Sequence, residues 1–164
     1  MFNFISYFES IARSLWELSH NESNIHFHRI SALSELEEFI ANSRNIEGYQ
    51  LLVLDRFSGK FDDSSNSDNL LDRKFHSFYL LKKAKAGDFD DIEDVNDGCL
   101  TVARKIISKL FYDKRYNLNG LTDLQRSSFS YTSIGPLAHG YYGLMVTFTT
   151  LDAVGITYYN TDWR

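Results

Sequence analysis

Residues 91–114 read DIEDVNDGCLTVARKIISKLFYDK, and this stretch decides the fold class of the chain. Its apolar residues recur at three- and four-residue spacing, the pattern of a helix with one buried stripe. The stripe comprises Ile92, Val95, Cys99, Val102, Ala103, Ile106, Ile107 and Leu110. Acidic residues precede or fill the first turns and Lys and Arg residues lie toward the end, which suits the helix dipole. We expect this long helix to pack across a sheet.

The sheet is predicted from short segments rich in β-branched and aromatic residues. The expected strands are residues 25–30, 49–57, 75–83, 128–134 and 141–151, with a last extended piece at 154–159. In the segment 141–151, Leu144, Val146 and Phe148 alternate with more polar residues, so one face is expected to be buried. Pro136 is expected to close the strand 128–134.

Two further helices are predicted before these strands. Residues 4–20 form an amphipathic pattern, and a second helix begins at Ser31 or Ser34 and stops near residues 45–48. The prediction is an α+β domain with an antiparallel sheet of about four to five strands, the long helix on one face and additional N-terminal helices. The chain is read as one domain, residues 1–164, comprising an N-terminal helix (1–22), a long hairpin loop (58–74) and a C-terminal extension (151–164).

The polar stretch 58–74 separates two predicted strands of one hairpin. Long loops in compact domains are usually either functional or disordered. We therefore predict that this loop contacts a neighbouring subunit. The candidate contact residues are Ser58, Gly59, Lys60, Phe61, Asp62, Asp63, Asn66, Asp68, Asn69, Leu70 and Leu71.

Composition bounds the remaining possibilities. The 164 residues are 43% hydrophobic and 15% aromatic, enough apolar material for one folded core. The formal net charge of −5 gives no overall field that attracts nucleic acid or anionic lipid. A single cysteine excludes an internal disulfide, and no run of about 18 apolar residues spans a membrane. The first 16 residues lack the pattern of a secretory signal, so we expect a protein made in a cytoplasm with no membrane partner.

No catalytic, cofactor or metal site is predicted, and we expect that the protein is not an enzyme. His26 and His28 share one face of a predicted strand, a spacing that binds a metal only where further ligands converge. No histidine adjoins a nucleophile motif, and Cys99 lies on the apolar stripe of the long helix, where a thiol is inert. The acidic residues match no calcium loop, and no glycine-rich phosphate loop is present.

The order of elements resembles that of the tail-terminator and tail-completion (head-tail joining) proteins of tailed bacteriophages. Three stretches carry the resemblance: KFHSFYLLKKA (74–84), DVNDGCLTVARKIISKLFYD (94–113) and FSYTSIGPLAHGYYGLMVTFT (129–149). They look like the second hairpin strand, the packing helix and the closing strands of that family, which shares no short invariant motif. The N-terminal helix and the tail from Thr150 lie outside the comparison.

This resemblance implies an antiparallel sheet with helices on one side. It further implies a homo-oligomeric ring, commonly a hexamer, located in the virion at the end of the tail tube or in the neck. The implied partners are tail tube and neck or connector proteins, with DNA only as cargo that passes through the lumen. No cofactor and no catalytic residue is implied. An acidic lumen would repel DNA and let it slide, so Asp or Glu residues are expected on the inner surface.

Two other functions remain open from the sequence. The first is a small accessory protein of a mobile element that binds one protein partner through a sheet edge or the first helix. The second is a small enzyme, for which His26, His28 and His76 with neighbouring acids are the available groups. The oligomeric state separates a ring protein from an accessory protein, and a metal between His26 and His28 would favour an enzyme.

Overall fold

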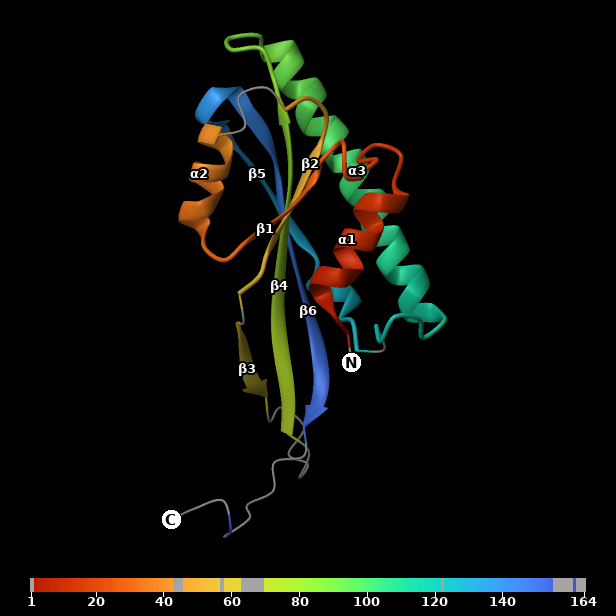
Figure 1. Cartoon of the computed structure of the whole chain (residues 1–164). Helices are drawn as coiled ribbons and strands as arrows, with labels where there is room; N and C mark the ends of the chain where they lie inside the picture. The colour runs from red at the N-terminus through yellow and green to blue at the C-terminus, as the bar shows by residue number, and fades with distance from the viewer. Residues whose placement is uncertain are drawn as a thin grey trace.

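The structure, a computed structural model, describes residues 2–42, 46–56, 58–62, 70–121, 123–154 and 161. These residues form one α+β fold with a single long helix, as the sequence predicts (Figure 1). In chain order the elements are α1 (Phe4–Ser14), β1 (Phe27–Ile30), α2 (Leu33–Asn42), β2 (Gln50–Leu54), β3 (Gly59–Asp62), β4 (Leu70–Lys83), α3 (Phe89–Arg115), η1 (Arg126–Ser128), β5 (Ser130–Leu137), η2 (Ala138–Gly140) and β6 (Tyr141–Val154).

The described strands form one six-stranded sheet in the order β1-β2-β4-β6-β5, with β3 paired to β4 off this path. β4 and β6 pair over 14 residues each and form the spine of the molecule. One edge of β4 carries two successive partners. Residues 71–74 of β4 pair with β3, and residues 78–81 pair with β2. The spine is therefore longer than either of the strands beside it on that edge.

The sheet differs from the predicted antiparallel sheet of four to five strands. It has six described strands, and β1 runs parallel to β2 with Phe27 opposite Leu51. A parallel pair needs a crossover connection, and α2 lies within it. The additional strand is β3, which lies inside the stretch 58–74 that we expected to be a loop. Residues 70–74 of that stretch belong to β4.

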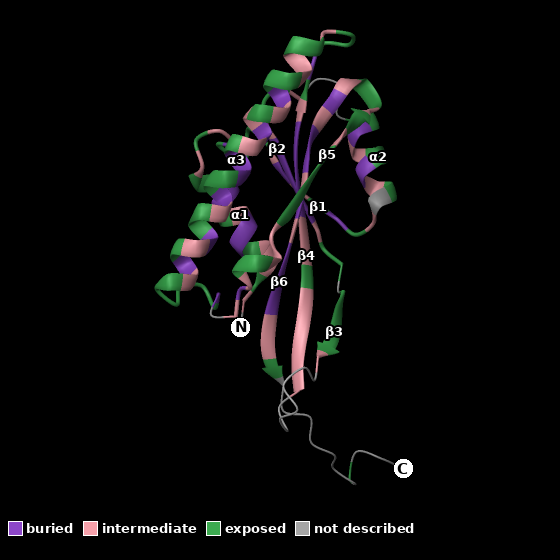
Figure 2. Ribbon diagram, turned by 180° about the vertical axis from the view of Figure 1, so that it is seen from behind, coloured by how far each residue is buried: buried purple, intermediate pink, exposed green. Residues whose placement is uncertain are grey.

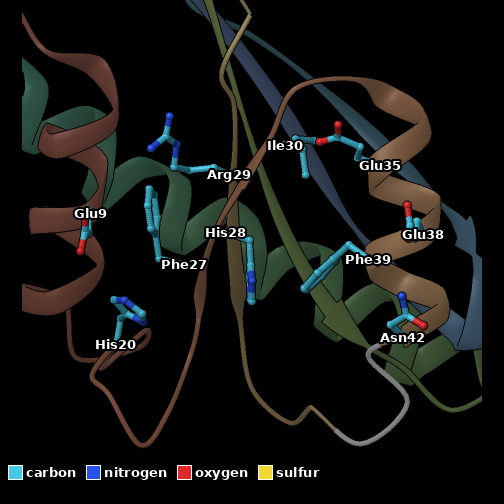
Figure 3. Close-up of a pocket in the computed structure, with 10 residues that line it drawn as sticks. All are labelled: Glu9, His20, Phe27, His28, Arg29, Ile30, Glu35, Glu38, Phe39 and Asn42. Carbon is cyan, nitrogen blue, oxygen red and sulfur yellow. The ribbon is translucent and has the colours of Figure 1, made fainter.

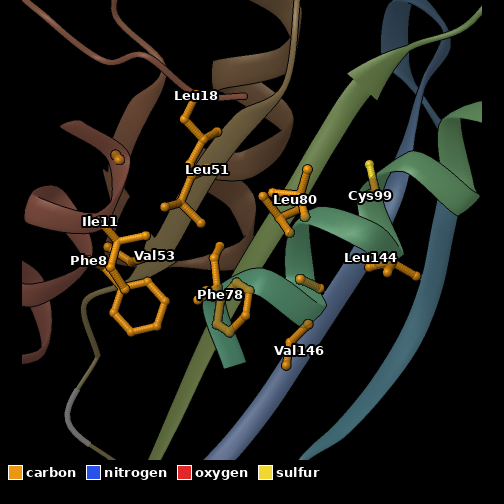
Figure 4. Packing of buried hydrophobic residues seen from close by; sticks show 14 of the residues in the cluster. Phe8, Ile11, Leu18, Leu51, Val53, Phe78, Leu80, Cys99, Leu144 and Val146 are labelled. Carbon is orange, nitrogen blue, oxygen red and sulfur yellow. The ribbon is translucent and has the colours of Figure 1, made fainter. Parts of the chain in front are cut away.

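Helices cover both faces of the upper sheet, whereas the resemblance implied helices on one side only. α1 and α3 lie on one face and α2 lies on the other (Figure 1). On β4, Phe78 and Leu80 belong to the core under α1 and α3, whereas Tyr79 and Leu81 belong to the core under α2. Figure 4 shows the first of these cores. Continuous apolar runs in a strand require cover on both faces, which explains the second helix layer.

Asp113 ties α1 to α3 inside the first layer. Its buried carboxylate accepts hydrogen bonds from the Tyr7 hydroxyl (2.7 Å), from Lys109 Nζ (2.5 Å) and from Asn119 Nδ2 (3.0 Å). Burial raises the pKa of this carboxyl, but the hydrogen bonds and the Lys109 charge outweigh burial, so its pKa lies below the usual value. The carboxylate is thus a charged, satisfied link between the two helices.

Several predicted boundaries are wrong. α1 ends at Ser14 rather than near residue 20, because Leu15 adopts extended dihedral angles and the chain then turns to bury Leu18. The first strand begins at Phe27, and β5 continues past Pro136 to Leu137 with a register shift. The predicted C-terminal extension is a strand at its start, because β6 runs to Val154. The predicted extended piece beyond Val154 lies outside the described residues.

Candidate functional site

The lower end of the sheet projects beyond all three helices and forms an arm. We define the arm as β3 together with residues 70–75 of β4 and residues 149–154 of β6. Figure 2 shows these strands in the colours of exposed and intermediate residues, below the buried centre of the sheet. Apart from Thr149 and Thr150 at its root, no described side chain of the arm is buried. The arm is therefore the part of the sheet with least cover from its own chain.

The arm contains most of the predicted contact residues that the structure describes. Ser58 precedes β3, and its carbonyl accepts a hydrogen bond from the Phe75 amide at 2.8 Å. The other described members lie in strands rather than in a loop: Gly59, Lys60, Phe61 and Asp62 form β3, and Leu70 and Leu71 begin β4. The predicted contact residues Asp63, Asn66, Asp68 and Asn69 lie outside the described residues. In its described part, the predicted contact surface therefore consists of two paired strands, β3 and the start of β4.

Each face of the arm carries an exposed phenylalanine. Phe61 pairs with Asp72, which is an even number of residues from Phe78 on β4 and therefore lies on the sheet face that α1 and α3 cover. Phe61 is 63% exposed. Phe75 has the parity of the α2 face and is 42% exposed. A small sheet of three strands is stable only when it has an apolar face or packs against another element. Both faces of the arm thus offer apolar area for contact with another surface.

Charged residues on the arm are balanced and mostly paired. Arg73 Nη2 lies 2.6 Å from Asp62 Oδ2 on the α2 side. On the opposite side, Lys74 forms ion pairs with Asp152 and, at 3.7 Å, with Asp72. Cross-strand pairs of this kind hold the strands in register without giving the arm a strong net charge.

His76 lies where the arm joins the body. Its Nε2 is 3.0 Å from Thr150 Oγ1, and its ring packs against Phe4 and Phe148 with centroid distances of 4.8 and 5.0 Å. Burial, with the nearby Lys74 charge, lowers the pKa of His76 to about 4. A cavity of about 380 Å³ beside it is lined by residues from the N-terminal segment, the end of β2 and the arm. His76 is therefore a neutral packing residue at neutral pH.

A second polar cluster joins β1 to β2. Gln50 is fully buried; its Nε2 donates to His26 Nδ1 at 2.8 Å, and its Oε1 accepts from His28 Nε2 at 3.1 Å. His20 Nδ1 accepts from the His26 amide at 3.1 Å. Burial lowers the pKa of His28, and the neighbouring His20 and His26 act in the same direction against the Gln50 hydrogen bond. The three histidines and the Gln50 side chain therefore provide hydrogen-bond partners for one another.

The groups considered for an enzyme do not converge. His28 has the parity of the α2 face and His76 has the parity of the α1 and α3 face, so the sheet separates them. In the described part of the chain, no group of three or more His, Cys, Asp or Glu side chains is arranged to hold a metal ion. Cys99 is buried in the core, and burial raises its thiol pKa to about 12, so it is a poor nucleophile.

A groove runs along β1, the first edge strand of the sheet. β1 passes between α1 and α2, and the hollow beside it has a volume of about 690 Å³ (Figure 3). Phe27 and Arg29 line the α1 side, and Ile30 and Phe39 line the α2 side. Three glutamates, Glu9, Glu35 and Glu38, also contribute to its walls. We call this feature the β1 groove.

Sequence reasoning missed Gln50, Asp113 and the β1 groove. A charged residue on the buried side of an amphipathic helix was the available signal for Asp113, since such residues need partners. Gln50 at the start of an apolar strand gave a similar signal. The groove had no sequence signal, because it depends on two helices that flank one strand.

Searches against protein-family models, curated proteins and solved structures each found no match to this chain. Among the described helices, none combines the length and apolar character needed to cross a membrane.

Proposed function

We propose that this chain is a structural virion protein that forms a ring at the end of a phage tail tube or in the neck, where it terminates the tail and joins it to the head. The observation that supports this proposal is the arm, a three-stranded projection with an exposed phenylalanine on each face. An uncovered ribbon of this kind gains stability when a neighbouring subunit packs on it. The resemblance to tail-terminator and tail-completion proteins supplies the biological setting.

In this proposal the body and the arm have separate tasks. The body has two buried cores of its own, whereas the arm reaches a neighbouring subunit or the ring beside it. Balanced ion pairs on the arm favour a protein partner. The net charge of −5 suits a ring through which DNA passes without adhering, and no catalytic residue is required.

The oligomeric state of the purified protein tests the proposal. Light scattering coupled to size exclusion, at several concentrations, is expected to give a closed oligomer, and electron microscopy is expected to show rings. The double variant Phe61→Ser, Phe75→Ser is expected to remain folded and to shift toward monomers. Trp16→Ser is the matched control, because Trp16 is an aromatic residue on the body that is 91% exposed. A wild-type protein that is monomeric at every concentration and forms no rings would contradict the proposal.

An accessory protein that binds one partner is the second candidate. The β1 groove favours it, since an open strand edge between two helices can accept a strand from another chain. The expected signature is a monomer that captures a different protein in a one-to-one complex. Neighbouring genes for capsid, sheath or tube proteins would favour the ring.

A further inference from the structure

Both ends of the sheet are open edges. The carbonyls of His26 and Ile30 accept hydrogen bonds from the amides of Leu51 in β2 and of Asp55 just after it. Because alternate residues of a strand point their main-chain groups to opposite sides, Phe27 and Arg29 direct theirs away from β2. No described strand pairs with that side of β1 or with the outer side of β5. Exposed edges of this kind are templates for pairing with another chain.

We propose that the β1 groove receives β5 of a second copy of this chain, so that the sheet continues from one subunit to the next. The inference rests on the proposed ring function and names the surfaces that join neighbouring subunits. The two surfaces differ, so the contact is head-to-tail, which is the arrangement that closes into a ring when the rotation fits.

The strand directions agree with this pairing. Within one chain β1 and β2 are parallel, and the steps from β2 to β4, β6 and β5 are each antiparallel. β5 therefore runs opposite to β1. Rotation about an axis along the strands preserves these directions, so β5 of the next subunit meets β1 in antiparallel orientation. Antiparallel pairing is also how each described strand other than β1 joins the sheet.

Side chains on β5 match the groove. Tyr131 is 58% exposed, and its cross-strand partner Val146 belongs to the α1 and α3 core. With the sheet faces kept in line, the start of β5 meets the end of β1, and Tyr131 would enter the groove on the α1 side, beside Arg29. On this side the groove is lined by Glu9, His20, Phe27 and Arg29 (Figure 3). A large aromatic residue that enters a pocket of its partner is a common anchor of a protein interface.

The β1 groove and the arm act together in this arrangement. Pairing along the four residues of β1 buries less than the roughly 1,200–2,000 Å² of a stable interface. The arm contributes the rest of the contact area. Loss of the β1 contact is thus expected to weaken the ring, and loss of both contacts to abolish it.

Disulfide trapping tests the inference in the full chain with Cys99→Ala. Arg29→Cys is combined with Tyr131→Cys or with Ser133→Cys, because all three positions share the α1 side of the sheet. Opposite residues of antiparallel strands have Cα spacings that allow a disulfide. Mild oxidation is expected to give a reducible ladder of oligomers for at least one pair. Thr132→Cys with Arg29→Cys is the matched control; Thr132 lies on the α2 side, so no ladder is expected.

The outcomes separate this inference from the proposed function. Rings without cross-links from either pair would overturn the β1–β5 contact and leave the ring function standing. A wild-type monomer at every concentration would contradict both. A folded Tyr131→Ala variant is expected to raise the concentration needed for assembly about tenfold, whereas Tyr116→Ala, on the exposed end of α3, is expected to leave it unchanged. Equal assembly of both variants would also overturn the contact.

Discussion

β4 is one continuous strand that passes through two different environments. Residues 78–81 are buried between helices on both faces, whereas residues 70–75 project into the arm, where none of them is buried. Main-chain pairing with β6 is the same in both halves, so hydrogen bonding does not distinguish them. Side-chain burial does. The comparison shows that the body holds most of the folding free energy and that the arm keeps its apolar surface for other contacts.

Phe78 and Phe75 give the sharpest test of this difference, because the same residue type lies three positions apart on one strand. Phe78→Ala is expected to lower the free energy of unfolding by about 3–5 kcal/mol, since its side chain is 0% exposed in the first core. Phe75→Ala is expected to cost about 1 kcal/mol or less. Urea denaturation at neutral pH measures both. Similar losses for the two variants would contradict the division between body and arm.

His76 at the junction predicts a loss of stability in acid. Its pKa is lowered from 6.5 to about 4 in the folded protein, so the folded state disfavours the charged imidazole. The contribution is fully present above pH 6.5 and is lost as the pH falls toward 4. At about 1.4 kcal/mol for each pKa unit, it amounts to about 3 kcal/mol. Unfolding measured between pH 7 and pH 4 is expected to show this loss in the wild type and to show a smaller one in His76→Gln. Identical slopes would contradict the assignment.

Asp113 tests the link between the two helices of the body. Asp113→Ala is expected to reduce the free energy of unfolding by about 2–3 kcal/mol, because the Tyr7 hydroxyl and the Asn119 amide lose their acceptor. Chemical denaturation at pH 7 gives the value. The conservative variant Asp113→Asn keeps an acceptor oxygen and is expected to lose less. A change below about 0.5 kcal/mol for the alanine variant would show that the cluster is not a structural link.

Lys74 should give the smallest effect, because it lies on the arm. Its ion pairs with Asp152 and Asp72 raise its pKa, against a smaller opposing effect of burial. Lys74→Met is expected to change the free energy of unfolding by about 1 kcal/mol or less, since ion pairs near solvent contribute little. Thermal melting at low and high salt measures the change. A loss as large as that of Phe78→Ala would mean that the arm contributes to the core of the fold.

Local sequence patterns predicted the elements in which buried residues recur at a regular spacing along the chain. The helix expected at 91–114 is α3, which extends it by only a residue or two at each end, because its apolar stripe is long and regular. The strand expected at 141–151 is β6, with Leu144, Val146 and Phe148 buried as their alternation predicts. These elements succeed because one face of each is buried along much of its length.

Elements that depend on a distant partner were not predictable. Residues 59–62 and 70–74 are polar enough to suggest a loop, and they are strands because they pair with each other and with β6. The buried polar residues Gln50 and Asp113 are satisfied by groups on other elements. In the candidate site, the sequence indicated that residues 58–74 lie at the surface, but not that the described part of this segment forms the paired strands of the arm.

By itself, the sequence determined the α+β class and the long helix, because composition and periodicity decide which residues are buried. The tertiary structure alone decided that β1 runs parallel to β2, that α2 covers the second face and that the β4–β6 pair extends beyond the helices. Those features arise from pairing between segments far apart in the chain. Such pairing has no local pattern, and it is this pairing that leaves the arm and the two sheet edges open.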